Sequence, residues 1–197
     1  MRLFVAIEIE AAVAREIAAV GDELRHRAAT LAPSSRITWV PPDRLHLTVR
    51  FIGEVNEPRG EALAAALQPP MLAEPFDLVV AGVGAFPGSG SPRVMWVGLG
   101  GELDSVHAVE QEVSTRLAQC GVPREDRAYR PHLTLARVHD AGGLRAKQLI
   151  EGFQTCEFGR SRVDTITLFQ SRLSPKGPTY VPLQRTFLRR TKFFRPV

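Results

Sequence analysis

Several features are scarce in this sequence of 197 residues, and each scarcity excludes a class of protein. Only two cysteines are present, Cys120 and Cys156, and their spacing fits neither a metal site nor a redox motif. No apolar run approaches the roughly 20 residues that span a bilayer. The first strand-like segment reaches the acidic Glu8 too soon for a secretory signal. We therefore expect a cytoplasmic protein with reduced thiols and no membrane-spanning segment.

Charge of one sign is not in large excess either. The chain has 25 Lys and Arg against 21 Asp and Glu, a formal net charge of +4, which favours no class of partner by itself. Residues 185–195 mix cations with aromatic side chains, a composition that suits phosphates and stacked bases. A last strand with a polar face, followed by a frayed end, accounts for the same composition. Both interpretations stay open.

The most informative feature is a tetrad, His-Leu-Thr-hydrophobic, that occurs twice. We call residues 46–49 the first motif and residues 132–135 the second motif. Each lies in an apolar, β-branched stretch, which predicts a strand. Because side chains alternate between the two faces of a strand, each His shares a face with the Thr two residues later. The opposite face would enter a core and carry Leu45, Leu47, Val49, Phe51, Leu133 and Leu135.

Hydrophobic periodicity predicts strands and helices in both halves of the chain. Val13, Ile17, Val20 and Leu24 form the stripe of an amphipathic helix in the first half, and residues 103–117 repeat that pattern in the second. We predict an α+β protein, a single bilobal domain over residues 1–197. Two mainly antiparallel sheets, flanked by helices and related by a pseudo-twofold axis, would form a central cleft with one motif in each lobe.

Paired histidines suit a reaction in which water displaces an oxygen from a phosphorus atom. Near neutral pH an imidazole can be neutral or charged, so one His can accept a proton from water while the other protonates the departing oxygen. Thr48 and Thr134 would donate hydrogen bonds to the nonbridging oxygens. Neither role requires a metal, and we predict no metal and no cofactor. Zinc in particular needs three or four protein ligands, and neither motif has a carboxylate or cysteine at ligand spacing.

Cations near the motifs would help to hold an anion. By strand alternation Arg44 and Arg50 share the face of the first His, and Arg130 shares that of the second. Arg130, with Tyr129 beside it, is the cation that we expect to bind substrate. Arg137 falls on the opposite face unless a bulge intervenes, and a structural ion pair is the alternative interpretation.

Three segments resemble the two-histidine phosphoesterases. They are residues 2–6, 45–53 and 130–137, and residues 171–173 with Gly177 and Tyr180 extend the similarity towards the C-terminus. The branch most similar is the bacterial and archaeal RNA 2′,3′-cyclic phosphodiesterases, historically called 2′-5′ RNA ligases. The resemblance covers essentially the whole chain.

The resemblance implies metal-independent opening of an RNA 2′,3′-cyclic phosphate to a 2′-phosphomonoester. His46 would be the proton donor, His132 the proton acceptor, and Thr48 and Thr134 the phosphate ligands. Reversible joining of RNA through a 2′-5′ linkage would be the same chemistry run backwards. The expected partner is an RNA end with a cyclic phosphate, and the expected state is a monomer. Two alternatives are kept: a nucleotide-binding module without turnover, and an enzyme for small cyclic nucleotides or ADP-ribose cyclic phosphate.

Overall fold

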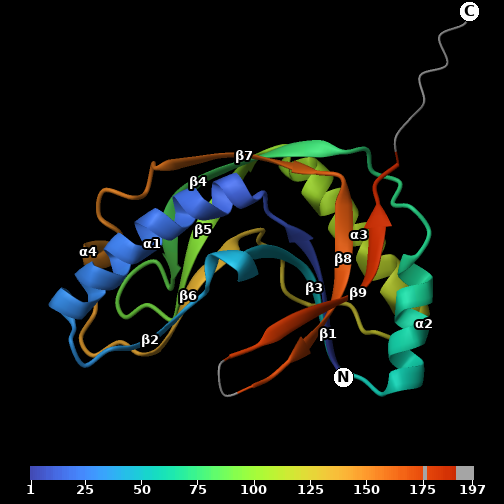
Figure 1. Cartoon of the computed structure of the whole chain (residues 1–197), viewed down its shortest axis with the longest axis horizontal. Helices are drawn as coiled ribbons and strands as arrows, with labels where there is room; N and C mark the ends of the chain where they lie inside the picture. The colour runs from blue at the N-terminus through green and yellow to red at the C-terminus, as the bar shows by residue number, and fades with distance from the viewer. Residues whose placement is uncertain (175–176, 190–197) are drawn as a thin grey trace, which may run out of the picture.

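A computed structural model describes residues 1–174 and 177–189 of the chain (Figure 1). The strands are β1 (Arg2–Glu8), β2 (Arg36–Trp39), β3 (His46–Glu54), β4 (Phe76–Phe86), β5 (Val94–Gly101), β6 (Leu133–Asp140), β7 (Glu157–Val163), β8 (Thr165–Arg172) and β9 (Thr179–Phe187). The helices are α1 (Ala11–Leu31), α2 (Glu57–Leu67), α3 (Leu103–Gln119) and α4 (Ala146–Ile150), with a 3-10 turn η1 (Pro42–Arg44).

The strands form one sheet of nine, in the order β7-β4-β5-β6-β3-β1-β8-β9, with β2 paired to β6. All pairings between these named strands are antiparallel. The α+β class with antiparallel strands and flanking helices is therefore confirmed. The two sheets expected for the lobes are halves of one path, joined between β3 and β6 by the pairing of Leu47 with Leu133.

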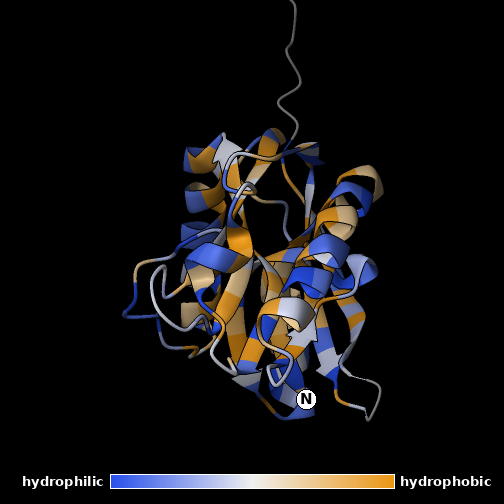
Figure 2. Ribbon diagram, turned by 90° about the vertical axis from the view of Figure 1, so that its left-hand side faces the viewer, coloured by the Kyte–Doolittle hydropathy of each residue, from blue (hydrophilic) through white to orange (hydrophobic). Residues whose placement is uncertain are grey.

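The helices cover the sheet in two groups. The helix α1 packs against β7 and α4, whereas α2 and α3 pack on each other and on the half of the sheet that contains β3 and β9 (Figure 1). Hydrophobic residues lie along the strands and on the helix faces turned towards them (Figure 2). The predicted stripes are confirmed, because the following residues are buried: Val13, Ile17 and Leu24 of α1, and Val106, Val109, Val113 and Leu117 of α3.

Bulges in β3 reverse part of the predicted alternation. The pairing with β1 runs from Ala6–Thr48 directly to Val5–Arg50, so the strand contains one extra residue at Val49. Arg50 is consequently buried, with 5% of its surface exposed, and its expected place on the histidine face was wrong. Phe51, expected in the core, is 45% exposed.

A bulge in β6 has a similar effect. In β5, Trp96 pairs with Thr134 and the preceding residue Met95 pairs with Ala136, so Leu135 is the extra residue of β6. Leu135 and Ala136 are both buried. The bulge returns Arg137 to the face of Thr134, which corrects its expected position on the opposite face.

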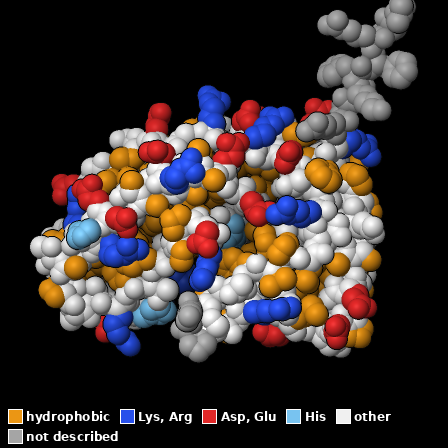
Figure 3. Space-filling model, viewed as in Figure 1, with side chains coloured by type: hydrophobic (Ala, Val, Ile, Leu, Met, Phe, Trp, Pro, Cys, Tyr) orange, Lys and Arg blue, Asp and Glu red, His pale blue; other side chains and the backbone are white. Residues whose placement is uncertain are grey.

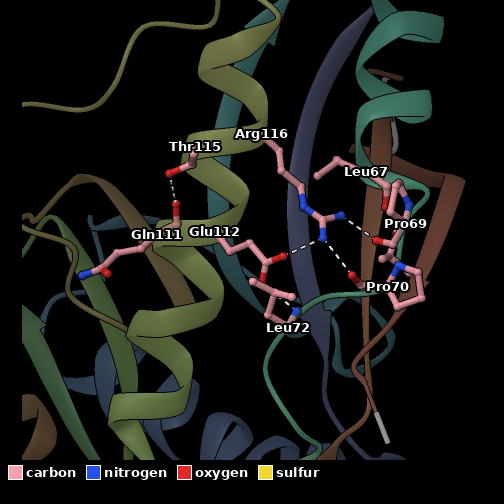
Figure 4. A network of polar contacts seen from close by, with 9 residues as sticks. Leu67, Pro69, Pro70, Leu72, Gln111, Glu112, Thr115 and Arg116 are labelled. Atoms are coloured by element: carbon pink, nitrogen blue, oxygen red, sulfur yellow. Dashed lines mark hydrogen bonds and ion pairs between the residues drawn. The ribbon is translucent and has the colours of Figure 1, made fainter.

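Arg116 ties α3 to the connection between α2 and β4 (Figure 4). Its guanidinium donates hydrogen bonds to the carbonyls of Pro69 and Pro70, at 2.5 and 2.8 Å, and pairs with Glu112 at 2.5 Å. Glu112 also accepts a bond from the backbone N–H of Leu72. None of these residues lines the cavity at the motifs described below, so we assign this network a structural role.

Three further predictions concern the cysteines, the tail and the membrane. Cys120 and Cys156 are unpaired. Of the basic and aromatic tail, residues 185–187 complete β9, and residues 190–195 lie outside the described residues. Within the described ranges, no helix is long and apolar enough to cross a membrane.

Candidate active site

The two motifs meet where β3 and β6 pair. Leu47 and Leu133 are direct partners in an antiparallel register. Because this pairing is antiparallel, His46 and Thr134 lie on one side of the leucine pair, and Thr48 and His132 lie on the other. Each histidine of the site is thus flanked by the threonine of the other motif.

A cavity of about 570 Å³ lies over this junction. Its lining comes from both halves of the sheet and comprises Arg2, Phe4, Val40, His46, Thr48, Phe51, Thr134, Arg137, Ser171, Leu173, Pro178 and Tyr180. His132 lies just outside this lining, half-buried, with the edge of its ring against Phe86 at 5.5 Å between centroids. Three of the four predicted motif residues therefore line one cavity, and the fourth, His132, directly precedes Leu133 at the junction of β3 and β6.

Both histidines have the same backbone anchor. The Nδ1 atom of His46 lies 2.7 Å from the carbonyl oxygen of Arg44, and Nδ1 of His132 lies 2.7 Å from that of Arg130. A carbonyl can only accept, so Nδ1 must carry a hydrogen in each ring. This bond fixes the tautomer and leaves Nε2 as the atom that gains or loses a proton. Because of this hydrogen bond, each histidine can exchange a proton only at Nε2.

His46 is enclosed by aromatic rings. Its ring lies 5.1 Å from that of Phe4 and 5.2 Å from that of Tyr180, the latter edge-on. Burial lowers the pKa of His46 below 6.5, the bond to the Arg44 carbonyl raises it in part, and the positive charge of Arg137 lowers it further. Burial also raises the pKa of Tyr180, so this hydroxyl stays protonated beside the imidazole.

Arg137 and Phe51 are site residues that the sequence pattern misplaced. Both follow a motif His by five residues, and both reach the cavity because a bulge shifts the alternation between them and that His. The only sequence signal is the adjacent apolar pair of Leu135 and Ala136, which breaks strict alternation in β6. Arg137 places a cation beside Thr134, and Arg2 lies over the ring of Phe51 at 5.1 Å.

Tyr129 and Arg130 lie outside the cavity lining. The Tyr129 hydroxyl donates a hydrogen bond of 2.9 Å to the backbone carbonyl of Thr48, and burial holds the pKa of this phenol well above its usual value. Arg130 is exposed, and its carbonyl anchors His132. Both residues support the geometry of the motifs, and their direct contact with substrate stays a prediction.

Positive charge is concentrated in the cavity and does not extend over the surrounding surface. On the face shown in Figure 3, basic and acidic side chains are interspersed over the surface. Among the described residues, the lining of the cavity contains two arginines and no carboxylate, so it favours an anion. Among residues 1–174 and 177–189, no group of three or more His, Cys, Asp or Glu is arranged to hold a metal ion.

Comparison with known proteins agrees with this arrangement. A family model described as the 2'-5' RNA ligase superfamily matches residues 10–174. The chain belongs to this superfamily. The superfamily is that of the two-histidine phosphoesterases, which confirms the resemblance found in the sequence.

Several members of the superfamily are similar over most of their length. An RNA 2′,3′-cyclic phosphodiesterase of Aeropyrum pernix is 38% identical over 167 residues, 80% of this chain and 92% of that protein. One of Archaeoglobus fulgidus is 33% identical over 184 residues, 93% of this chain and 98% of that protein. The crystal structure of E. coli LigT complexed with 3′-AMP has a TM-score of 0.68 at 26% identity, and covers 96% of this chain and 98% of that one.

Proposed function

We propose that this protein hydrolyses RNA 2′,3′-cyclic phosphate ends to 2′-phosphomonoesters by paired-histidine acid–base catalysis without a metal. The observation that carries the proposal is the matched anchoring of His46 and His132, in which Nδ1 of each ring is bonded to a backbone carbonyl and Nε2 is left for proton transfer. Superfamily membership and the names of the relatives support the substrate class.

The reaction assigns one proton transfer to each histidine. Nε2 of His132 accepts a proton from water as the water oxygen bonds to phosphorus. The bond from phosphorus to the 3′ oxygen then breaks, and Nε2–H of His46 donates its proton to that oxygen. Each transfer contributes about 10²- to 10⁴-fold in rate. The donor and acceptor assignments rest on the family resemblance.

Three side chains would hold the phosphate. Thr48 and Thr134 line the cavity from opposite strands, so their hydroxyls can donate to different nonbridging oxygens. Arg137 supplies a cation on the same face, where a guanidinium can donate two parallel hydrogen bonds. These donors would stabilise the charge that grows on the oxygens in the transition state.

The lowered pKa of His46 fits a proton donor that is charged by its substrate. In the free protein burial keeps this imidazole mainly neutral at pH 7. An anionic phosphate beside it favours the protonated form, because opposite charges attract strongly in a partly buried site. We infer that His46 takes up its proton when the cyclic phosphate binds. After it has donated that proton, His46 is protonated again when the next substrate binds.

The direct test is the turnover of an oligonucleotide that ends in a 2′,3′-cyclic phosphate, with and without EDTA. We expect activity in EDTA and a 2′-phosphate product, and loss of at least 10²-fold in His46→Ala and in His132→Ala. His26→Ala, on the exposed face of α1, is the matched control. A 3′-phosphate product would contradict the leaving-group assignment, and full activity in either mutant would contradict the mechanism.

The same assay distinguishes the alternatives. Binding of the oligonucleotide with no product after long incubation would indicate a binding module. Turnover of mononucleotide 2′,3′-cyclic phosphates or ADP-ribose cyclic phosphate, but not of the oligonucleotide, would indicate an enzyme for small substrates. Supplying an RNA with a free 5′ hydroxyl tests the reverse, ligating direction.

A further inference from the structure

Trp96 lies next to the site but outside the cavity that takes its phosphate. In β5 it pairs with Thr134 of β6 on one side and with Gly84 of β4 on the other. Side chains of direct cross-strand partners project from the same face of a sheet. Trp96 is therefore on the face of Thr134, one strand further from the first motif, and it is absent from the cavity lining.

Gly84 makes room for the indole. A Cβ atom on Gly84 would lie 2.1, 2.3 and 2.5 Å from three successive ring atoms of Trp96, Cζ2, Cη2 and Cε2. Such similar distances to three bonded atoms place the ring face, and not its edge, over the glycine backbone. A Cβ atom added to Gly98 would lie 3.5 Å from Cζ3 of the same ring. One face of the indole thus packs over the backbone of Gly84, and Trp96 stays partly exposed.

Phe86 connects this indole to the catalytic histidine. Its ring centroid is 5.2 Å from that of Trp96 at an interplanar angle of 33°, and 5.5 Å from that of His132 at 85°. Phe86 and Trp96 therefore form a continuous aromatic wall that runs outward from His132 on the site face of β4 and β5. We call this pair the aromatic wall.

We propose that the aromatic wall is a second nucleotide subsite, on which the base preceding the cyclic-phosphate nucleotide stacks against Trp96. This inference rests on the proposed function and makes single-stranded RNA, rather than a mononucleotide, the preferred substrate. The terminal nucleoside would occupy the cavity beside Phe51 and Tyr180. The next base along the strand then meets the part of the indole that stays exposed, whereas the ring nitrogen Nε1 is buried. Stacking on an aromatic side chain tolerates any base, so the subsite selects length and not sequence.

Kinetics on two substrates test the subsite. We expect Trp96→Leu to raise the KM for a trinucleotide 2′,3′-cyclic phosphate about tenfold and to leave the KM for a mononucleotide 2′,3′-cyclic phosphate within twofold. Trp96→Phe, which retains a stacking ring, should restore most of the affinity. Trp39→Leu, on the edge strand β2, is the control. Equal loss on both substrates would overturn the proposal, and so would an unchanged KM for the trinucleotide.

A binding measurement separates this inference from the proposed reaction. The chain has two tryptophans, so Trp39→Phe leaves Trp96 as the only indole. A trinucleotide with a terminal 3′-phosphate should quench its fluorescence, whereas 3′-AMP should not. If no variant turns over any cyclic phosphate but this quenching persists, the reaction is wrong and the subsite stands. Equal quenching by both ligands, or by neither, would overturn the subsite whatever the turnover.

Discussion

The hydroxyl of Tyr129 donates a 2.9 Å hydrogen bond to the backbone carbonyl of Thr48. This bond joins the segment that leads into the second motif to the middle of the first. Arg50 reinforces the same connection, since its guanidinium donates to the carbonyl of Pro123 and lies 3.5 Å from Glu125. The relative placement of the two histidines therefore depends on contacts that never reach the cavity.

Tyr129→Phe should weaken this connection without removing the ring. The loss of one hydrogen bond is expected to lower the free energy of unfolding by about 1 kcal/mol. For a chain of this size, that corresponds to roughly 2–4 °C in Tm. Because the bond holds the motifs rather than the substrate, kcat should fall more than KM changes. Calorimetry and steady-state kinetics test this, and a KM effect alone would indicate direct contact with substrate.

Arg137→Gln should reduce affinity for the anion and change the titration of His46. We expect kcat/KM to fall by about 10- to 100-fold, in line with the loss of a charge-assisted hydrogen bond. The pKa of His46 should rise, because the charge of Arg137 lowers it. Arg15→Gln, on the exposed face of α1 and outside the cavity lining, is the matched control. An NMR titration that showed no change in His46 would contradict the assigned proximity.

The His46 imidazole should titrate below pH 6.5 in the free protein, since burial disfavours its charged form. Inorganic phosphate bound in the cavity should raise this pKa. Both are measurable by NMR of the ring resonances across pH 4.5–8. A midpoint at or above 6.5 in the free protein would contradict the burial argument, whereas insensitivity to phosphate would contradict the site.

The free energy of unfolding should depend on pH through the same histidine, His46. The unfolded chain takes up a proton on this histidine near pH 6.5, whereas the folded chain takes it up only at lower pH. The free energy of unfolding is therefore expected to decrease as the pH falls from 6.5 to the folded pKa. His46→Gln should remove that part of the pH dependence. Denaturant unfolding at pH 7.5 and 5.5 compares the two proteins, and an identical decrease in both would contradict this linkage.

Gly84→Ala should disturb the aromatic wall, since its Cβ would overlap the indole of Trp96. Overpacking of this kind costs about 1–3 kcal/mol of stability. Gly100→Ala in β5 is the control, because the nearest atom to its new Cβ is 3.9 Å away. Chemical denaturation measures both, and equal stability of the two variants would show that the indole moves aside freely.

Much of the architecture follows from local patterns. The stripes of α1 and α3 are buried as their periodicity predicts, and His46 and Thr48 line the same cavity. Alternation failed where β3 and β6 bulge. Arg50 lies in the interior instead of on the histidine face. Arg137 lines the cavity instead of lying on the opposite face of the sheet. A bulge inserts one residue relative to the neighbouring strand, so its position depends on pairing with a distant segment.

The sequence by itself determined which residues can carry protons and hold phosphate, because imidazole, hydroxyl and guanidinium chemistry belongs to the side chains. It also determined the strands and helices that present them, since hydrophobic periodicity is local. Only the tertiary structure decided which cations enter the cavity and that Tyr129 bonds to the backbone of Thr48. Those features depend on register and contact between segments far apart in the sequence, 81 residues in the case of Tyr129 and Thr48, where local propensity has no influence.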